Sequence, residues 1–168
     1  MIAIMAVEEF EETIKNITKI ILNNPQKMIR EEDLKNLSKD FNYEEVMSEI
    51  YVKLINIGFE LIKTKFLEQT FYILTSEGKD DNVTPSQYGT LALIVALSKE
   101  VDENIKTEDL QDIFSNVWDT DIKFLIESDY IRIFDELGIT KVAPLGKAIM
   151  KNIIADLKLK NLLNLFSE

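Results

Sequence analysis

The side chains of this sequence that could carry out chemistry are carboxylates and hydroxyls. The chain has 30 acidic residues but no histidine and no cysteine. Histidine acid–base catalysis, cysteine nucleophiles, disulfides and the usual zinc sites are therefore excluded. A serine nucleophile would need a lysine or a carboxylate as its base. Ser38 and Ser86 instead lie at or near the ends of expected helices, where serine is a common capping residue.

The carboxylates do not form an evident reactive pair. Acidic neighbours such as Glu8–Glu9, Glu11–Glu12 and Asp80–Asp81 are typical of solvated surface. Asp119 and Asp121 could bind a divalent cation through oxygen ligands, but no calcium-loop pattern surrounds them. We therefore expect a binding protein and not an enzyme, with no catalytic residues, no cofactor and no metal.

The first half of the chain has helical periodicity followed by strand periodicity. Apolar residues at steps of four, three and four predict a helix that buries Phe10, Ile14, Ile17 and Ile21. A short extended piece at 28–29 and a helix over 31–39 follow. Asn42 and Glu45 have the spacing of a capping box that opens a third helix. Its expected buried face is Val46, Ile50, Leu54 and Ile57.

Spacing of two then predicts a hairpin, with strands around 59–61 and 71–74 and a turn across 63–70. The polar segment 75–83 is the expected linker. Thr84, Pro85 and Gln87 then predict a capped start for a nearly all-apolar, buried helix. A further short strand at Ile105, a second helix around 110–114, a third helix capped by Asp119, and a second hairpin follow.

The order of elements therefore occurs twice. We expect an α+β, mostly helical protein made of two tandem winged-helix domains. The N-terminal domain, residues 1–78, would serve dimerisation. The C-terminal domain, residues 79–168, would bind a partner and end in a closing helix from Leu145 to Phe166.

The charge distribution favours a protein partner over DNA. The net charge is −11, and it divides into −5 for residues 1–80 and −6 for residues 81–168. A helix-turn-helix reader places its third helix beside phosphates, yet both expected third helices are acidic, which is unfavourable against a polyanion. A weak DNA contact is left to the lysines of the last segment, Lys141, Lys147, Lys151, Lys158 and Lys160.

Several apolar residues are unexpected in a monomer. Phe66 and Leu67 fall in the predicted hairpin turn, as candidate contacts with a second subunit or as a small satellite cluster of the same one. Apolar residues at both ends make a similar case. A partner groove is expected between the third and closing helices of the second domain, with an acidic rim at Asp119, Asp121 and Glu127. Its candidate residues are Trp118, Phe124, Leu162 and Phe166.

No apolar run is long enough to span a bilayer, and the N-terminal run lacks the basic flank of a signal peptide. A cytoplasmic location is expected.

The two halves together resemble the segregation and condensation protein ScpB family. Four stretches carry the resemblance: Met28 to Leu34, Tyr43 to Ile62, Thr70 to Thr75, and Thr84 to Leu97 with its Thr-Pro-Ser-Gln opening. The family's second wing usually holds a Gly-Arg-Pro segment, whereas this chain has Asp135 to Gly146 there. Related tandem winged-helix subunits of the Nse or MukE kind therefore remain open.

The resemblance implies a non-catalytic accessory subunit of an SMC–kleisin complex for chromosome condensation and segregation, associated with the nucleoid. It further implies a homodimer formed largely through the first domain, and a kleisin (ScpA-like) segment held by the second. The alternative is a tandem winged-helix transcription regulator or transcription-factor subunit, which would need basic recognition helices or a basic partner.

Overall fold

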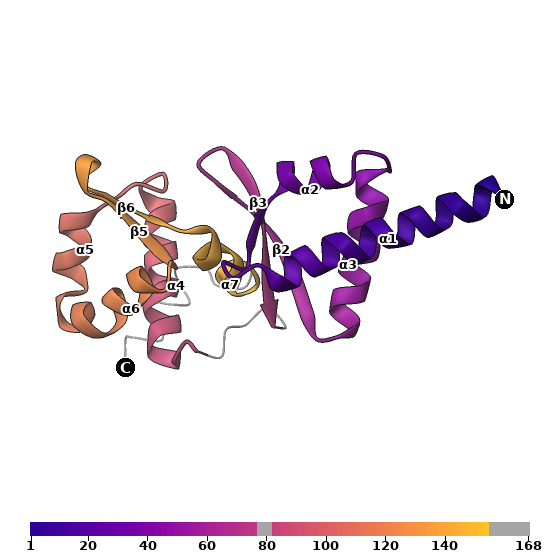
Figure 1. Cartoon of the computed structure of the whole chain (residues 1–168). Helices are drawn as coiled ribbons and strands as arrows, with labels where there is room; N and C mark the ends of the chain where they lie inside the picture. The colour runs from indigo at the N-terminus through magenta and orange to yellow at the C-terminus, as the bar shows by residue number, and fades with distance from the viewer. Residues whose placement is uncertain (77–81, 155–168) are drawn as a thin grey trace. The chain divides into compact units, whose positions relative to one another are not determined.

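Helices and two small antiparallel sheets make up residues 1–76 and 82–154, which the computed structural model describes. The expected α+β, mostly helical class is confirmed. The chain divides into two compact units, Met1–Lys79 and Asp80–Glu168, called unit 1 and unit 2 below (Figure 1). This division falls inside the segment 75–83, where a linker was expected.

Unit 1 contains three helices and one three-stranded sheet among its described residues. Its elements are α1 (Ile2–Asn23), β1 (Met28–Arg30), α2 (Glu31–Leu37), α3 (Tyr43–Asn56), β2 (Phe59–Phe66) and β3 (Gln69–Ser76). The antiparallel sheet has the order β1-β3-β2. The first turns of α1 extend beyond α2 and α3 (Figure 1).

The core of unit 1 lies between the helices and one face of this sheet. Ile14, Ile17 and Ile21 of α1 are buried, as the periodicity predicts, and they share a cluster with Leu34, Val46, Ile50, Leu54, Leu61 and Leu74. Asn42 caps α3, since its side chain accepts the Glu45 N–H at 3.1 Å. The expectation for Ile57 is wrong. It follows the last turn of α3 and is 60% exposed.

The hairpin turn is much shorter than expected. Phe66 pairs with Gln69, so Leu67 and Glu68 alone form the turn and residues 63–66 belong to β2. Both turn residues have positive φ, 48° and 63°. Two-residue turns of this kind normally carry asparagine or glycine, and the absence of that signal explains why the sequence suggested a longer loop.

Unit 2 contains the helix and strand order of unit 1, with additional short helical segments and a closing helix. Its elements are α4 (Pro85–Glu100), β4 (Ile105–Lys106), α5 (Thr107–Ile113), η1 (Ser115–Val117), η2 (Trp118–Ile122), α6 (Lys123–Glu127), β5 (Ile131–Phe134), η3 (Asp135–Leu137), β6 (Ile139–Val142) and α7 (Pro144–Ile154). The antiparallel sheet order is β4-β6-β5, which matches β1-β3-β2 position by position.

The start of α4 has the capping box that the sequence predicts. Thr84 Oγ1 accepts the Gln87 N–H at 3.3 Å, and Gln87 Oε1 accepts the Thr84 N–H at 2.9 Å. Because two donors of the first turn are satisfied in this way, α4 begins at a fixed residue. Its side chains Leu91, Ile94 and Val95 then lie in the core of unit 2.

The third helix of unit 2 is not the single capped helix that was expected. Residues Trp118–Ile122 form a π-helical turn, η2, which leads directly into the short α6. Asp119 therefore does not cap a helix; it is an exposed residue within η2. The expected closing helix begins at Pro144 and is described to Ile154. The rest of that expectation lies outside the described residues.

Gly146 allows α7 to approach the sheet of unit 2. A Cβ atom at this position would overlap the carbonyl oxygen of Tyr130 and lie 3.0 Å from Val142 Cγ1. That same carbonyl accepts the Ala143 N–H at 2.9 Å, so it is held in place. At Gly89 in α4, by contrast, a Cβ would meet nothing within 4 Å.

Gly146→Ala should lower the free energy of unfolding by about 1–3 kcal/mol, because the added methyl must displace backbone. Gly89→Ala is the matched control, and it should raise stability by roughly 0.5–1 kcal/mol since alanine favours the helix. Urea unfolding followed by circular dichroism measures both. Equal effects of the two substitutions would contradict the close packing of α7.

Candidate protein-interaction surfaces

The outer side of α3 presents large apolar side chains. Tyr51, Val52 and Ile55 are 41%, 51% and 45% exposed, and these three residues are called the α3 face below. They point away from the buried side of the helix, which holds Val46, Met47, Ile50 and Leu54. Since the core of unit 1 does not use them, they are available for contact with another molecule.

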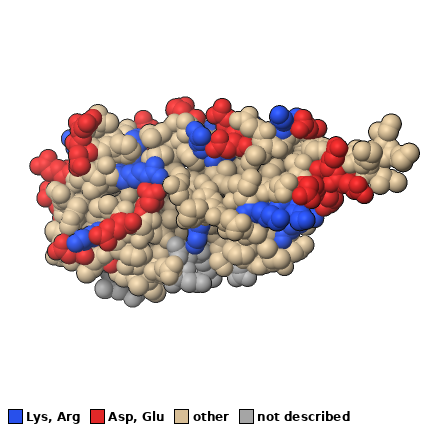
Figure 2. Space-filling view, in the orientation of Figure 1, with Lys and Arg blue, Asp and Glu red and all other residues tan. Residues whose placement is uncertain are grey.

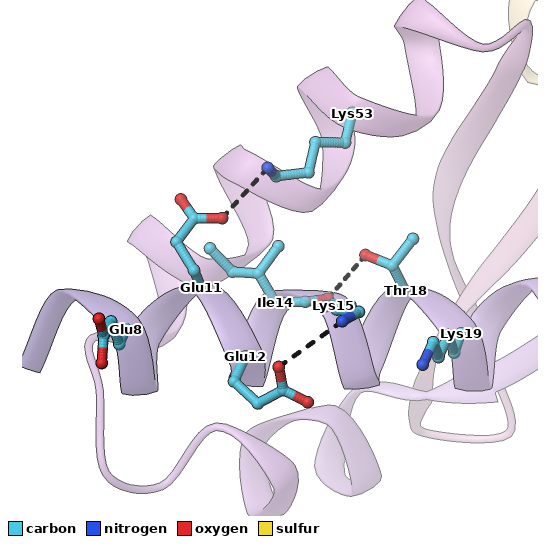
Figure 3. Close-up of a pocket in the computed structure, with 8 residues that line it drawn as sticks. All are labelled: Glu8, Glu11, Glu12, Ile14, Lys15, Thr18, Lys19 and Lys53. Atoms are coloured by element: carbon cyan, nitrogen blue, oxygen red, sulfur yellow. Dashed lines mark hydrogen bonds and ion pairs between the residues drawn. The ribbon is translucent and has the colours of Figure 1, made fainter. Parts of the chain in front are cut away.

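The charges around the α3 face are acidic. Glu44, Glu45 and Glu49 are exposed on the same helix. The basic residue Lys53 lies 3.4 Å from Glu11 Oε2 of α1, and Figure 3 shows its side chain directed at that carboxylate. The positive charge of Lys53 is therefore partly balanced within unit 1, which leaves α3 apolar and acidic.

Two further lysines of unit 1 are balanced by a single carboxylate. Glu31 lies 2.8 Å from Lys63 and 3.5 Å from Lys35. The hydrogen bond from Lys63 lowers the pKa of Glu31, with smaller contributions from Lys35. The same bond raises the pKa of Lys63. These lysines also lie over aromatic rings, Lys35 over Tyr43 and Lys63 over Tyr72.

Tyr43 is the unusual member of this group. Its hydroxyl is buried without a hydrogen-bond partner, and desolvation by burial raises the pKa of Tyr43. The phenol therefore stays neutral, and its ring packs against the core of unit 1. The group as a whole joins α2 to the sheet.

In unit 2, Asp121 is buried, whereas the sequence placed it on an exposed acidic rim. It is 6% exposed, and its Oδ2 accepts hydrogen bonds from Ser86 at 2.9 Å and Thr90 at 2.8 Å. Asp121 thus fastens the π-helical turn to the start of α4. Asp119 and Glu127 are exposed, and a rim formed by them stays a prediction.

Of the four residues expected to line a partner groove, the structure describes two. Trp118 and Phe124 are partly buried and pack against the core of unit 2, where Phe124 stacks on Tyr130 with ring centroids 6.2 Å apart. Leu162 and Phe166 lie outside the described residues. The groove therefore stays a prediction.

The two expected dimer contacts also differ from each other. Phe66 ends β2 and is 4% exposed, whereas Leu67 in the turn is 56% exposed. The hairpin therefore offers Leu67, and not Phe66, to solvent. A dimer contact at this hairpin stays a prediction.

The lysines expected to touch DNA weakly are partly engaged within unit 2. Lys141 donates to Asn104 Oδ1 at 2.7 Å, and Lys147 lies 2.9 Å from Glu103. Lys151 is exposed on α7. Lys158 and Lys160 lie outside the described residues.

The α3 face is the surface that the sequence analysis missed. Its signal is present, since Tyr51, Val52 and Ile55 form a second apolar side on a helix whose first apolar side is already complete. The exposed apolar start of α1 was recognised only as an unusual terminus. Met1, Ile2, Ile4, Met5 and Val7 are 58–97% exposed there.

No model of a known protein family matches the sequence, and no curated protein matches it. Within the described residues, no helix combines the length and apolarity that crossing a membrane requires.

Asp121→Ala should lower the free energy of unfolding by about 2 kcal/mol, because two hydroxyl donors, one of them buried, lose a charged acceptor. Asp119→Ala changes a neighbouring exposed carboxylate and should stay within about 0.5 kcal/mol of the parent. Urea denaturation of the three proteins makes the comparison. Indistinguishable midpoints for the two variants would contradict the structural role given to Asp121.

Proposed function

We propose that this chain is a non-catalytic accessory subunit of an SMC–kleisin complex, which self-associates and binds a kleisin-like partner. The observation that carries the proposal is the α3 face: apolar residues with an acidic surround, on the helix that would read DNA in a helix-turn-helix protein. Such a surface can pack against a protein, and its carboxylates repel the phosphates of a nucleic acid.

The repeated topology supports two winged-helix domains. In each unit a short strand lies between the first and second helical segments, a third helical segment follows, and an antiparallel hairpin closes the sheet. The matching sheet orders, β1-β3-β2 and β4-β6-β5, are those expected when one architecture occurs twice. Tandem winged helices are the arrangement that the ScpB resemblance implies.

The acidic surface favours the same conclusion. Figure 2 shows many carboxylates on the visible side of the chain, with the cations in several small groups between them. Of the lysines described above, four lie within 4 Å of a carboxylate: Lys35, Lys53, Lys63 and Lys147. A DNA-binding module instead concentrates cations on one face.

The division of labour between the units follows from the resemblance. Unit 1 would provide self-association, and unit 2 would hold the kleisin segment close to Phe124 and Trp118. The α3 face adds a second kleisin contact, in unit 1, that the resemblance did not indicate. An acidic rim would speed encounter with a basic-flanked segment more than it would tighten the complex.

Co-expression with the kleisin encoded in the same genome tests the proposal. Full-length protein should retain the kleisin on affinity purification. The Val52→Glu/Ile55→Glu variant should lose about ten-fold or more of the captured kleisin, because charge on a desolvated apolar contact is costly.

Leu37→Glu/Val101→Glu is the matched control, since both residues are exposed and apolar, at 46% and 47%, and belong neither to the α3 face nor to the residues proposed to hold the kleisin. It should bind as the parent does. Full capture by a folded α3-face variant would remove the α3 face from the proposal. Failure of the parent protein to retain any kleisin would contradict the proposed function itself.

A further inference from the structure

The outer side of α1 carries a regular stripe of exposed residues. Counting along the helix, positions 5, 8, 12, 15, 19 and 22 are separated by alternating steps of three and four, which is the spacing of a coiled-coil seam. All six residues are exposed, and they are Met5, Glu8, Glu12, Lys15, Lys19 and Leu22. This set is called the α1 stripe. It lies away from the buried side formed by Ile14, Ile17 and Ile21.

The charges of the α1 stripe are arranged so that two copies of α1, lying antiparallel, place opposite charges next to each other. From the N-terminal end it reads apolar, acid, acid, base, base, apolar. Figure 2 shows the acidic group next to the apolar tip of α1 and the basic group farther along the same helix. When two copies of α1 lie antiparallel, Glu8 faces Lys19, Glu12 faces Lys15 and Met5 faces Leu22. A parallel pair would instead place like charges together.

Unit 1 leaves these groups available for such a pairing. Glu12 and Lys15 lie 3.8 Å apart, yet their side chains are 60% and 62% exposed. Within the part of the chain that the structure describes, Glu8 and Lys19 have no ion-pair partner. A groove of about 560 Å³ runs beside the stripe, lined by Glu8, Lys15, Thr18 and Lys53 among others, and Figure 3 shows the charged side chains spread along α1.

The apolar ends of the α1 stripe give the pairing a driving force beyond charge. Met5 is 58% exposed and Leu22 is 38% exposed. The preceding turn adds Ile2 and Ile4, at 87% and 64%. In an antiparallel pair, the apolar start of each helix packs against the apolar end of the other helix. The pair therefore contains two such contacts, and both remove apolar surface from water.

We infer that a second copy of this chain covers the α1 stripe, as an antiparallel helix pair. The inference rests on the self-association included in the proposed function, and on no other part of it. It assigns the contact to α1 and not to the β2–β3 hairpin, and it sets the register by the pairs Glu8–Lys19, Glu12–Lys15 and Met5–Leu22.

Charge reversal in two complementary variants tests the inference. Glu8→Lys/Glu12→Lys makes the stripe entirely basic, and Lys15→Glu/Lys19→Glu makes it entirely acidic. Each variant alone should self-associate about ten-fold or more weakly than the parent at low salt, because four cross-chain pairs become repulsive. An equimolar mixture should restore dimers at the parent's affinity, since all four pairs are again opposite in sign.

Sedimentation equilibrium measures each protein and the mixture, and circular dichroism checks that α1 stays folded. Glu9→Lys/Glu32→Lys is the matched control, because it makes the same change in charge on exposed residues outside both the stripe and the α3 face. It should dimerise as the parent does.

Three outcomes decide the result. Weak single variants with a restored mixture support the α1 pair. Dimers that neither variant weakens would overturn it while leaving self-association intact. A parent protein that stays a 19.4 kDa monomer at all concentrations would overturn both the α1 pair and the proposed self-association.

Discussion

Both units of this chain must build a core from few residues, and this constraint governs what the rest of the surface can do. Small domains bury a smaller share of their surface than large ones, so their large apolar side chains are normally needed inside. In unit 1 the core uses Ile14, Ile17 and Ile21 from α1 together with Leu54 and Leu74. The unit nevertheless leaves Tyr51, Val52 and Ile55 outside on α3. Apolar residues that a small core can spare are therefore strong candidates for contacts with other molecules.

Charge determines which class of molecule those contacts suit. The α3 helix pairs its apolar face with carboxylates, and its lysine is balanced by Glu11 of α1. Glu31 balances Lys35 and Lys63 in the same way. Buried Asp121 is satisfied by hydroxyl donors, so its charge serves the fold. Lys53 and Lys63 thus link elements within unit 1, while the exposed acids and apolar residues of α3 are left to meet a partner.

The features that could be predicted from the sequence are those encoded by neighbours along the chain. The caps at Asn42 and Thr84 each depend on residues three positions apart, and the buried faces follow helical spacing. The two-residue turn at Leu67 could not be predicted, because its residues lack the usual preference for positive φ. The role of Asp121 could not be predicted either, because its hydrogen-bond partners lie 31 and 35 residues away in the sequence. The α3 face could have been predicted from its spacing, but an already complete buried face on that helix concealed it.

A titration of fluorescently labelled duplex DNA with the purified protein, at about 50 mM and about 200 mM salt, tests the central claim most directly. The claim is that the exposed surfaces of α3 and of the η2–α6 segment suit a protein partner and not nucleic acid. The account predicts no saturable binding below about 10⁻⁴ M at either salt concentration, because the exposed carboxylates of α3 and of η2–α6 repel phosphates. Tight binding that falls steeply, by about 10³-fold or more, between the two concentrations would show several phosphate contacts and would contradict the account.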